Sequence, residues 1–512
     1  MNNTKKRRRS LWACVAAWLI FTLGAALLTA VIWELQELNV GIAEILFTLS
    51  SPMEGANSGI AAGAFKKCLP WFGGVSALYG WLLYYFRCRN RVHFTLGLQI
   101  GKWKRSISSK RIYRCFLALF PIGVWVLACF TIERDLFFTA YLKNRMDKST
   151  IYEDYYVFPS DVEIQPQGKT KNVICLYLES MEITYADTAS GGAQEVDLMP
   201  GLTELAYDNL SFGTVPGQRL GGMDNVHGTG WTSAALMATT SGVPFSFPKS
   251  DATEVGVSTQ FAPGLETLGT VLQQKGYRQE FLCGSSATFG GRRTYFQQHG
   301  DYEIYDYNTA LQNGDIPQGY NVWWGLEDAK LYEIAKKQLL ELSASDAPFN
   351  LTLLTVDTHF PDGYLCQLCE KDKYPVPLAS IVECADRQAV EFVRWCQEQS
   401  FYEDTVIVIM GDHPRMDTLL VDGVPMSERK VYACFLNARM PQDMPDPSER
   451  QYTHMDLFPT ILASMGFTIQ GDRLGLGTNL FSWEPTLEEQ YGRQWLDDQL
   501  QKTSLFYEEH FY

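Results

Sequence analysis

Three apolar segments of the sequence end in side chains that can bind a metal or move a proton. They are VICLYL before Glu179, LTLLTV before Asp357 and His359, and TVIVIM before Asp412 and His413. Apolar runs of this length are typical of buried strands, and parallel sheets collect functional groups at the carboxyl ends of their strands. The sequence therefore predicts a group of carboxylates and imidazoles at one edge of a sheet.

Two carboxylates and one imidazole, from Glu179, Asp412 and His413, form a donor set that suits a divalent cation such as Mn²⁺ or Zn²⁺. Each residue also has an ordinary interpretation when it is taken alone. Asp412 and His413 can form a salt bridge or a cap after a strand, and Glu179 can lie on the surface. A further group is needed before a metal site is favoured.

The segment GTGWTSAA, residues 228–235, supplies that group as a glycine-bearing turn followed by a helix of small residues. Thr232 stands near the start of this helix, where unpaired N–H groups and a partial positive charge suit a phosphate oxyanion. In the ordinary alternative, Thr232 only caps the helix. A hydroxyl at this position, beside a predicted cation, favours phosphoryl chemistry.

Six motifs in this order resemble the lipoteichoic acid synthase and phosphoglycerol transferase family, within the alkaline phosphatase and sulfatase superfamily. They are NVICLYLES at 172–180, GTGWTSAALMATTSGVP at 228–244, FGGRRTYFQQHG at 289–300, DTHFPDG at 357–363, GDHP at 411–414 and THMDLFPTILASMG at 453–466. The resemblance covers roughly residues 168–480, and the apolar, basic N-terminal region is also similar. It implies membrane helices followed by a sulfatase-like α/β/α domain with a mainly parallel sheet.

Carried over residue by residue, the resemblance implies that Glu179, Thr232, Asp412 and His413 bind one divalent cation. Manganese is usual in relatives, and magnesium or zinc remains an alternative. The resemblance further implies that Thr232 is the nucleophile that attacks phosphorus.

Arg292 and His359 are implied to be catalytic and to contact the phosphoglycerol group, with Asp357 as a further substrate-binding residue. A guanidinium suits this task because it is always charged and can bind two phosphate oxygens. The ordinary alternatives are a surface arginine beside Arg293 and a hydrogen-bonded histidine at a strand end.

The implied activity is transfer of glycerol phosphate from phosphatidylglycerol, through a glycerophospho-threonine, to a glucan, glycolipid or polyglycerol phosphate acceptor. Two departures leave the acceptor open. Lipoteichoic acid synthases resemble one another in having five membrane spans, and Gly290 stands where some relatives have an aromatic residue. The residues of the motifs resemble more closely the branch of the family that decorates glucans with phosphoglycerol.

Three apolar runs without charges, residues 11–33, 69–86 and 115–132, predict membrane helices within a domain of residues 1–134. Lys and Arg precede the first run and separate the second from the third, so both flanks are predicted to be cytoplasmic. Three crossings then place the catalytic domain of a multi-pass cell-membrane protein on the extracytoplasmic face. Residues 40–65 are apolar in patches and fit either an interfacial or re-entrant piece or an outer loop.

The remaining chain divides into three parts. Residues 135–168 mix charges, aromatics and turn formers and predict a linker. Residues 169–480 alternate strand-like runs with helical patterns, at 265–275 and 379–399 for example, which predicts an α/β fold with a parallel sheet covered on both faces. Residues 481–512 are predicted to be a tail that packs on or near this domain.

Charge is divided unevenly along the chain. Residues 1–114 carry 16 Lys and Arg against 4 acidic residues, and the rest carries 27 against 54. An acidic remainder argues against nucleic acid as a partner, because phosphate neutralisation needs clustered Lys and Arg. The partners that the resemblance implies are instead membrane lipids and the envelope acceptor.

Seven of the twelve cysteines follow residue 132, where disulfides can persist if this part lies outside the cell. Cys366 and Cys369 have the spacing of half a zinc site, but no second CxxC pair exists. A local disulfide or two ordinary cysteines fit this pattern better than a metal. The odd number leaves at least one cysteine unpaired.

Four other functions compete with the implied one. A sulfatase needs Cys or Ser in a C/S-x-P-x-R context, whereas Ser-Ala-Ala-Leu follows Thr232. A phosphoethanolamine transferase uses the same kind of nucleophile and an outer-leaflet lipid. A two-metal phosphodiesterase would bind a second cation with Asp357, His359 and His454, although His454 is better explained as a hydrogen-bonding residue. The last rival is a non-catalytic binding protein on the same fold.

Overall fold

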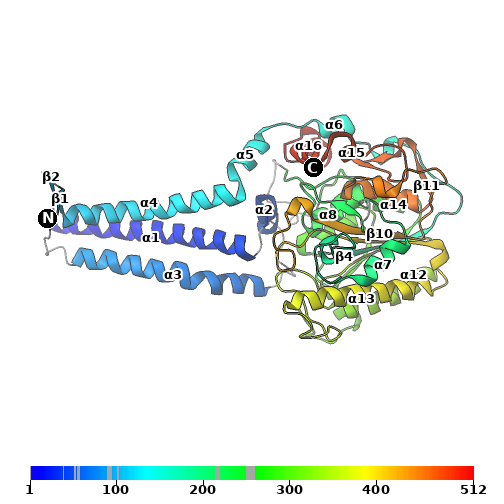
Figure 1. The fold of residues 1–512 in the computed structure, drawn as a ribbon, viewed down its shortest axis with the longest axis horizontal. Coiled ribbons are helices and arrows are strands. Elements are labelled where there is room, and N and C mark those ends of the chain that lie inside the picture. Colours follow the sequence, from blue (N-terminus) through cyan, green and yellow to red (C-terminus); the bar gives the residue numbers. More distant parts are fainter. Residues whose placement is uncertain are drawn as a thin grey trace. The chain divides into compact units, whose positions relative to one another are not determined.

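The computed structural model describes residues 2–37, 40–50, 54, 58–88, 95–100, 103–213, 220–248 and 260–512. The chain forms two compact units (Figure 1). Unit 1 comprises Met1–Ile42 and Asn57–Tyr141, and unit 2 comprises Ala43–Ala56 and Leu142–Tyr512.

Unit 1 consists of three long helices and a hairpin. They are α1 (Asn2–Glu37), α3 (Ser58–Cys88), α4 (Ser109–Leu136), β1 (Thr95–Ile100) and β2 (Trp103–Ser108). Within them, Leu11–Glu37 and Cys115–Leu136 are long and apolar enough to cross a membrane. The third expected span, residues 69–86, lies in α3 but does not reach the same apolar level, because it is rich in Trp, Tyr and Gly.

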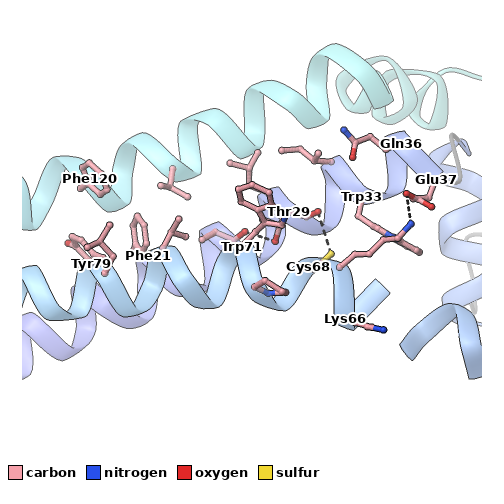
Figure 2. A pocket seen from close by; sticks show the side chains of 18 of the residues that line it. Phe21, Thr29, Trp33, Gln36, Glu37, Lys66, Cys68, Trp71, Tyr79 and Phe120 are labelled. Atoms are coloured by element: carbon pink, nitrogen blue, oxygen red, sulfur yellow. Dashed lines mark hydrogen bonds and ion pairs between the residues drawn. The ribbon is translucent and has the colours of Figure 1, made fainter. Parts of the chain in front are cut away.

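The three helices of unit 1 contact one another through aromatic side chains. Phe21, Tyr79 and Phe120 pack together, and a cavity of about 870 Å³ lies beside them. Figure 2 shows these rings near one end of the cavity and Glu37 near the other. Large apolar side chains such as Leu23 and Trp71 are 63% and 71% exposed. An apolar surface of this kind suits lipid better than water.

Unit 2 is built on a seven-stranded sheet with the order β5-β10-β9-β4-β8-β6-β7. The strands are β4 (Asn172–Leu178), β5 (Gly222–Asp224), β6 (Arg278–Cys283), β7 (Glu303–Tyr305), β8 (Phe349–Leu354), β9 (Thr405–Gly411) and β10 (Lys430–Leu436). The five strands from β9 to β7 run parallel, and β10 is antiparallel to both its neighbours. The predicted α/β class with a mainly parallel sheet is confirmed.

Helices cover both faces of this sheet. One face carries α8 (Thr232–Ser241), α9 (Leu268–Gln274), α10 (Arg292–Gln298) and α14 (Leu457–Ser464), and the other carries α7 (Pro200–Asp208), α11 (Tyr307–Asn313), α12 (Asp328–Ser343) and α13 (Pro377–Gln397). Alternate side chains of β4 enter the two cores, with Val173 and Cys175 in one and Ile174 and Leu176 in the other. Because both faces are buried, the strand is apolar throughout.

Segments outside the sheet also belong to unit 2. The residues predicted as a linker include α5 (Phe138–Met146), α6 (Ile151–Tyr155) and β3 (Ile164–Pro166), and β3 pairs with β11 (Phe467–Ile469). From Leu142 onward they are therefore part of this unit. The C-terminal elements are β12 (Arg473–Leu474), β13 (Gly477–Thr478), α15 (Leu487–Tyr491), α16 (Arg493–Leu500) and α17 (Leu505–His510). Tyr507 and Phe511 join the core.

Candidate metal centre

The carboxyl ends of β4 and β9 bring the first predicted residues together. The two strands are parallel neighbours, and Leu178 pairs with Gly411, so the next residues, Glu179 and Asp412, emerge side by side. Glu179, Asp412 and His413 are 2%, 0% and 1% exposed. One ligand atom from each lies within 4.8 Å of the others, which is a separation that a single cation can bridge.

Asp412 has one carboxylate oxygen that accepts no hydrogen bond from the described residues. Its Oδ1 accepts hydrogen bonds from the Ser180 amide at 2.7 Å and the His413 amide at 2.9 Å. Its Oδ2 is buried and has no hydrogen bond among the described residues. Burial raises the pKa of the Asp412 carboxyl to about 6, and the Glu179 carboxylate adds to the rise. A buried acceptor of this kind calls for a cation.

His413 is oriented so that one ring nitrogen faces the carboxylates. Its Nδ1 lies 2.9 Å from the Pro414 carbonyl and donates to it, which leaves Nε2 as the free lone pair. Nε2 lies 3.6 Å from Glu179 Oε1 and 3.4 Å from Asp412 Oδ2. Burial acts to lower the pKa of His413, but the two carboxylates outweigh it and the pKa rises. The same negative charge favours a metal ion.

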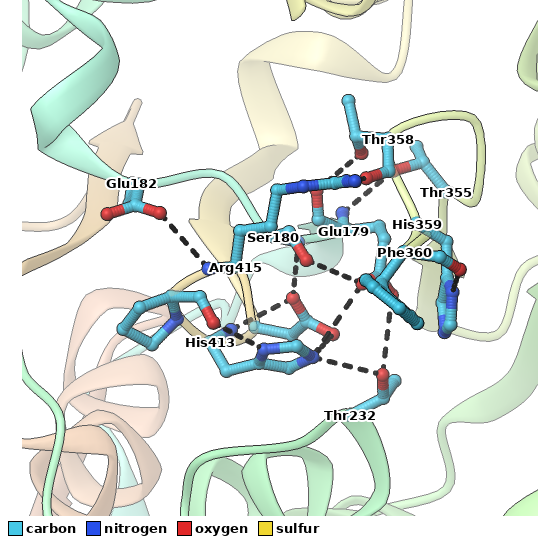
Figure 3. A network of polar contacts seen from close by, with 12 residues as sticks. Glu179, Ser180, Glu182, Thr232, Thr355, Thr358, His359, Phe360, His413 and Arg415 are labelled. Atoms are coloured by element: carbon cyan, nitrogen blue, oxygen red, sulfur yellow. Dashed lines mark hydrogen bonds and ion pairs between the residues drawn. The ribbon is translucent and has the colours of Figure 1, made fainter. Parts of the chain in front are cut away.

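Thr232 completes the group as the first residue of α8. Its Oγ1 lies 3.3 Å from Glu179 Oε2 and 3.4 Å from His413 Nε2 (Figure 3). The N-cap residue is Trp231, and no side chain caps the helix, so the interpretation of Thr232 as a cap is wrong. Gly228 has φ +82°, and a Cβ there would lie 2.4 Å from the Phe245 carbonyl oxygen. Glycine is therefore required in the turn that aims α8 at the sheet edge.

The donor atoms fit a divalent cation. Two carboxylates, an imidazole lone pair and a hydroxyl converge, and Asp412 Oδ2 lacks any other partner. Mn²⁺, Mg²⁺ and Zn²⁺ all accept this mixture to different degrees. The arrangement can hold a hydroxyl nucleophile against a metal.

His359 follows β8 and lies at the rim of this group. Its Nδ1 donates to the Phe360 carbonyl at 2.6 Å, and its ring lies 4.5 Å from the Trp324 ring. Burial lowers the pKa of His359 to about 4. The imidazole is therefore neutral near pH 7 with Nε2 as its lone pair.

The Asp357 carboxylate, which the sequence suggested as a substrate-binding group, is directed toward the start of α12. Its Oδ1 accepts a hydrogen bond from the Asp328 amide at 3.2 Å, at the start of α12. Burial and the neighbouring Asp328 carboxyl raise its pKa well above the ordinary range. None of its hydrogen bonds among the described residues reaches Thr232 or the metal ligands, so substrate binding by Asp357 remains a prediction.

Arg292 is buried at the start of α10, with part of its guanidinium committed to the protein. Nε donates to the Phe289 carbonyl at 3.0 Å, and Nη2 donates to Ser285 Oγ and the Ser286 carbonyl, each at 3.0 Å. Nη1 donates to no described residue and remains available to an anion. Arg293 instead pairs with Asp306 at 2.7 Å.

Gly290 explains how this arginine loop approaches the nucleophile helix. Its φ is +65°, and a Cβ would lie 2.5 Å from the Oγ of Ser233, the residue after Thr232. An aromatic side chain, as some relatives have, would not fit in this conformation. Glycine thus allows the loop to lie directly against the start of α8.

Arg415, which the sequence did not single out, holds two loops of the centre together. Arg415 is 1% exposed and donates to the carbonyl oxygens of Thr358 and Pro361. It therefore joins the loop that carries His413 to the loop that carries His359. The signal was present, because Arg415 follows the GDHP motif directly.

Helix α2 (Ile42–Ser50) also contacts the site, from a segment that the sequence left as an interfacial piece or an outer loop. Phe47 is 4% exposed, and its ring lies 5.5 Å from Trp231 and 5.1 Å from Phe245. The charge of Glu44 contributes to the raised pKa of His413. A short amphipathic helix therefore packs beside the nucleophile.

The second cation site of a two-metal enzyme is not formed in the part of the chain that the structure describes. Asp357, His359 and His454 are not within cation distance of one another. His454 Nε2 instead donates to the Asp412 carbonyl at 2.6 Å. It supports the backbone of a metal ligand.

Comparison with known proteins identifies a family and several relatives. The Sulfatase family profile matches residues 171–467. Phosphoglycerol transferase I from Xanthomonas campestris pv. campestris (strain B100) is 29% identical over 349 residues, which are 67% of this chain and 47% of that protein. The same-named protein from Escherichia coli O127:H6 is 27% identical over 457 residues, 87% of this chain and 53% of that protein. The chain spans about half the length of these curated relatives.

Among solved structures, the lipooligosaccharide phosphoethanolamine transferase A from Neisseria meningitidis has a similar fold. The identity is 14% with a TM-score of 0.51, over 89% of this chain and 84% of that chain. This likeness concerns the fold alone.

Proposed function

Because the chain belongs to the Sulfatase family, we propose that unit 2 is a phosphotransferase that moves glycerol phosphate from phosphatidylglycerol to a cell-envelope acceptor. The similarity to proteins named phosphoglycerol transferase I supports the group transferred. The observation that carries the proposal is the position of Thr232 Oγ1, 3.3 Å from Glu179 and 3.4 Å from His413. A hydroxyl held among metal ligands is an activated nucleophile.

In the first step, Thr232 Oγ1 attacks the phosphorus and the bond from phosphorus to the diacylglycerol oxygen breaks. The Thr232 proton passes through solvent to that departing oxygen, and a glycerophospho-threonine remains. A divalent cation held by Glu179, Asp412 and His413, manganese in most relatives, would lower the hydroxyl pKa and neutralise charge on the phosphoryl oxygens. The N-terminus of α8 favours an anion at Thr232. Nη1 of Arg292 supplies a further charged donor for the phosphate.

In the second step, His359 accepts the proton of the acceptor hydroxyl as that oxygen attacks the phosphothreonine. The bond from phosphorus to Thr232 Oγ1 breaks, and the proton is returned to Thr232 to restore its hydroxyl. The lowered pKa of His359 and its Nδ1 hydrogen bond make it a base with a free Nε2 at neutral pH. Because a neutral imidazole of this kind has no proton on Nε2, His359 cannot act as an acid at the start of the cycle. Any proton that it gives to the departing diacylglycerol oxygen must first be accepted in the same cycle.

The apolar helices of unit 1 fit an enzyme whose donor is a membrane lipid. Two of them are long and apolar enough to span a bilayer, and a tether keeps the catalytic unit at a high effective concentration of donor. We place unit 2 on the extracytoplasmic face, where a glucan, glycolipid or polyglycerol phosphate offers the accepting hydroxyl.

The mass of the peptide that contains Thr232 tests this proposal. Full-length protein in detergent is incubated with phosphatidylglycerol and Mn²⁺ and then digested. We expect that peptide to gain one phosphoglycerol group in the wild type and in Ser233→Ala, but not in Thr232→Ala. A phosphoethanolamine adduct from phosphatidylethanolamine alone would select the rival transferase. An unmodified peptide, with diacylglycerol release unchanged in Thr232→Ala, would refute the nucleophile.

A further inference from the structure

A second buried cluster of potential metal ligands lies in unit 2, apart from the residues of the candidate metal centre. It consists of Cys366 and Cys369, in the loop between β8 and α13, and Cys384, on α13. The three residues are 2%, 8% and 2% exposed. We propose that this thiol cluster is a structural site for a thiophilic divalent cation of the zinc class.

The spacing of the sulfur atoms supports a metal. Cys366 Sγ lies 3.8 Å from Cys384 Sγ and 3.6 Å from Cys369 Sγ, and all three sulfurs lie within 4.8 Å of one another. Zn–S bonds of about 2.3 Å in a tetrahedron put neighbouring sulfurs about 3.8 Å apart. A disulfide joins only two sulfurs, at about 2.05 Å, and would leave the third thiol buried without a function. No two of the described cysteines are bonded.

Polar groups around the cluster donate toward sulfur, as thiolates require. Gln388 Nε2 lies 3.3 Å from Cys384 Sγ, Arg387 Nη2 lies 3.5 Å from the same atom, and the Leu368 amide lies 3.4 Å from Cys366 Sγ. Donors and a nearby positive charge favour the thiolate over the neutral thiol. They would gain little from a disulfide, which is a weak acceptor.

Gln388 places a buried acceptor atom close to the cluster. It is 5% exposed, it lies one turn after Cys384 on α13, and its Oε1 is buried with no hydrogen-bond partner among the described residues. Three thiolates leave a tetrahedral cation with a fourth position. Because Gln388 turns its Nε2 toward Cys384 Sγ and Cys366 Sγ, a water is the simplest fourth ligand, and the Gln388 oxygen would reach this position only if the amide were flipped.

The site would fix the loop that begins with His359. This loop leaves β8, and its early turns are closed by hydrogen bonds from the Tyr364 amide to the Asp357 carbonyl, 2.7 Å, and from the Gly363 amide to the His359 carbonyl, 3.1 Å. The next residues reach Cys366 and then α13. A cation shared by the loop and the helix would restrict the path of the loop and thereby hold His359 in position.

Metal and thiol analysis of the purified full-length chain in detergent tests the proposal. We expect one equivalent of zinc that survives in Asp412→Asn but is lost in Cys384→Ser. Cys396→Ser, also a buried cysteine on α13, is the matched control and should keep its zinc. Zinc lost in Asp412→Asn and kept in Cys384→Ser would overturn the assignment.

Two measurements on the unmutated chain keep the test independent of how Cys384→Ser folds. Loading with Co²⁺ should produce a strong sulfur-to-cobalt charge-transfer absorption. Alkylation after unfolding and chelation, without reductant, should label Cys366, Cys369 and Cys384. Absence of the absorption, or protection of two of these thiols from alkylation, would mean a disulfide with one free thiol and would refute the metal site.

Discussion

Two clusters of three ligating side chains lie in unit 2, and they are assembled in different ways. Glu179, Asp412 and His413 stand at the ends of adjacent parallel strands, whereas the thiol cluster joins a loop to a helix. Strand ends are fixed by the sheet, so the first cluster follows from topology. The second depends on the path of a loop, which the sheet does not determine.

The two clusters also differ in chemistry and in what lies beside them. Carboxylate oxygens and an imidazole favour harder cations, and thiolates favour softer ones. The first cluster adjoins the half-buried Thr232 hydroxyl, whereas the second is surrounded by donors directed at sulfur. One arrangement suits catalysis and the other suits structure.

The largest expected effect is the loss of turnover when Asp412, a ligand of the first cluster only, is replaced. Asp412→Asn removes a charged ligand, so we expect turnover of phosphatidylglycerol to fall by about 10³-fold or more, with weaker Mn²⁺ binding. Turnover is followed as diacylglycerol release over a Mn²⁺ titration. If the asparagine variant kept wild-type turnover at low Mn²⁺, the catalytic role of the first cluster would be lost.

Each cluster has a cationic neighbour, which gives a matched pair of variants. Arg292→Gln should lower kcat/KM about 100-fold, because a charged hydrogen bond to phosphate contributes roughly 1.5–3 kcal/mol. Arg387→Gln should leave kcat/KM near the wild-type value and weaken zinc binding about 10-fold, as for other groups that support metal ligands. Lipid kinetics measure kcat/KM, and competition with a chelator measures the affinity for zinc. If both variants changed the same one of these two quantities, the two clusters would not have separate roles.

The strand-end cluster could be predicted because apolar runs and the residues after them are both visible in the sequence. β4, β8 and β9 were predicted within two residues at each end, and Glu179, Thr232, Asp412 and His413 do meet. The role of Arg292 in phosphate binding stays a prediction. The close approach of Gly290 to Ser233, which places the Arg292 loop against α8, was not foreseen.

Other features could not be predicted, because they depend on contacts between distant segments. Cys384 lies 15 residues after Cys369 on a helix whose apolar pattern explains it fully. The spacing of Cys366 and Cys369 alone favoured a local disulfide or two ordinary cysteines over a metal. Asp357 follows a strand in the same way as Glu179, yet its carboxylate turns to the start of α12.

A smaller effect is expected from α2, which packs beside the first cluster only. Phe47→Ala removes the ring that contacts Trp231 and Phe245, so the start of α8 loses support. We expect kcat/KM to fall about 10-fold, because small displacements of a nucleophile are costly, while zinc content stays unchanged. Leu46→Ala, an exposed position on the same helix, is the control. If both substitutions changed kcat/KM equally, the contact of α2 with the start of α8 would have no specific role in activity.

The smallest effect concerns Asp328, whose pKa is raised by burial and by charges from both clusters. Its Oδ1 and Oδ2 accept from the Val356 amide, 2.7 Å, and the Asp357 amide, 3.1 Å. Burial raises the pKa of Asp328 to about 7, and the charges of Cys366 and Glu179 add to the rise. In the unfolded chain the pKa of an aspartate is about 3.9.

Between these two values the folded chain binds more protons than the unfolded chain, so the free energy of unfolding should fall as pH rises from about 4 to about 7. Asp328→Asn should flatten this dependence, at a cost of about 1 kcal/mol for a lost hydrogen bond. Thermal unfolding of the full chain at pH 5 and pH 7.5 measures the difference, with the exposed Asp498→Asn as control. Equal pH dependence of Tm in the wild type and in Asp328→Asn would mean that Asp328 is charged in the folded state. The negative charge between the two clusters would then be greater than its burial suggests, and both cations would be held more tightly than their own ligands require.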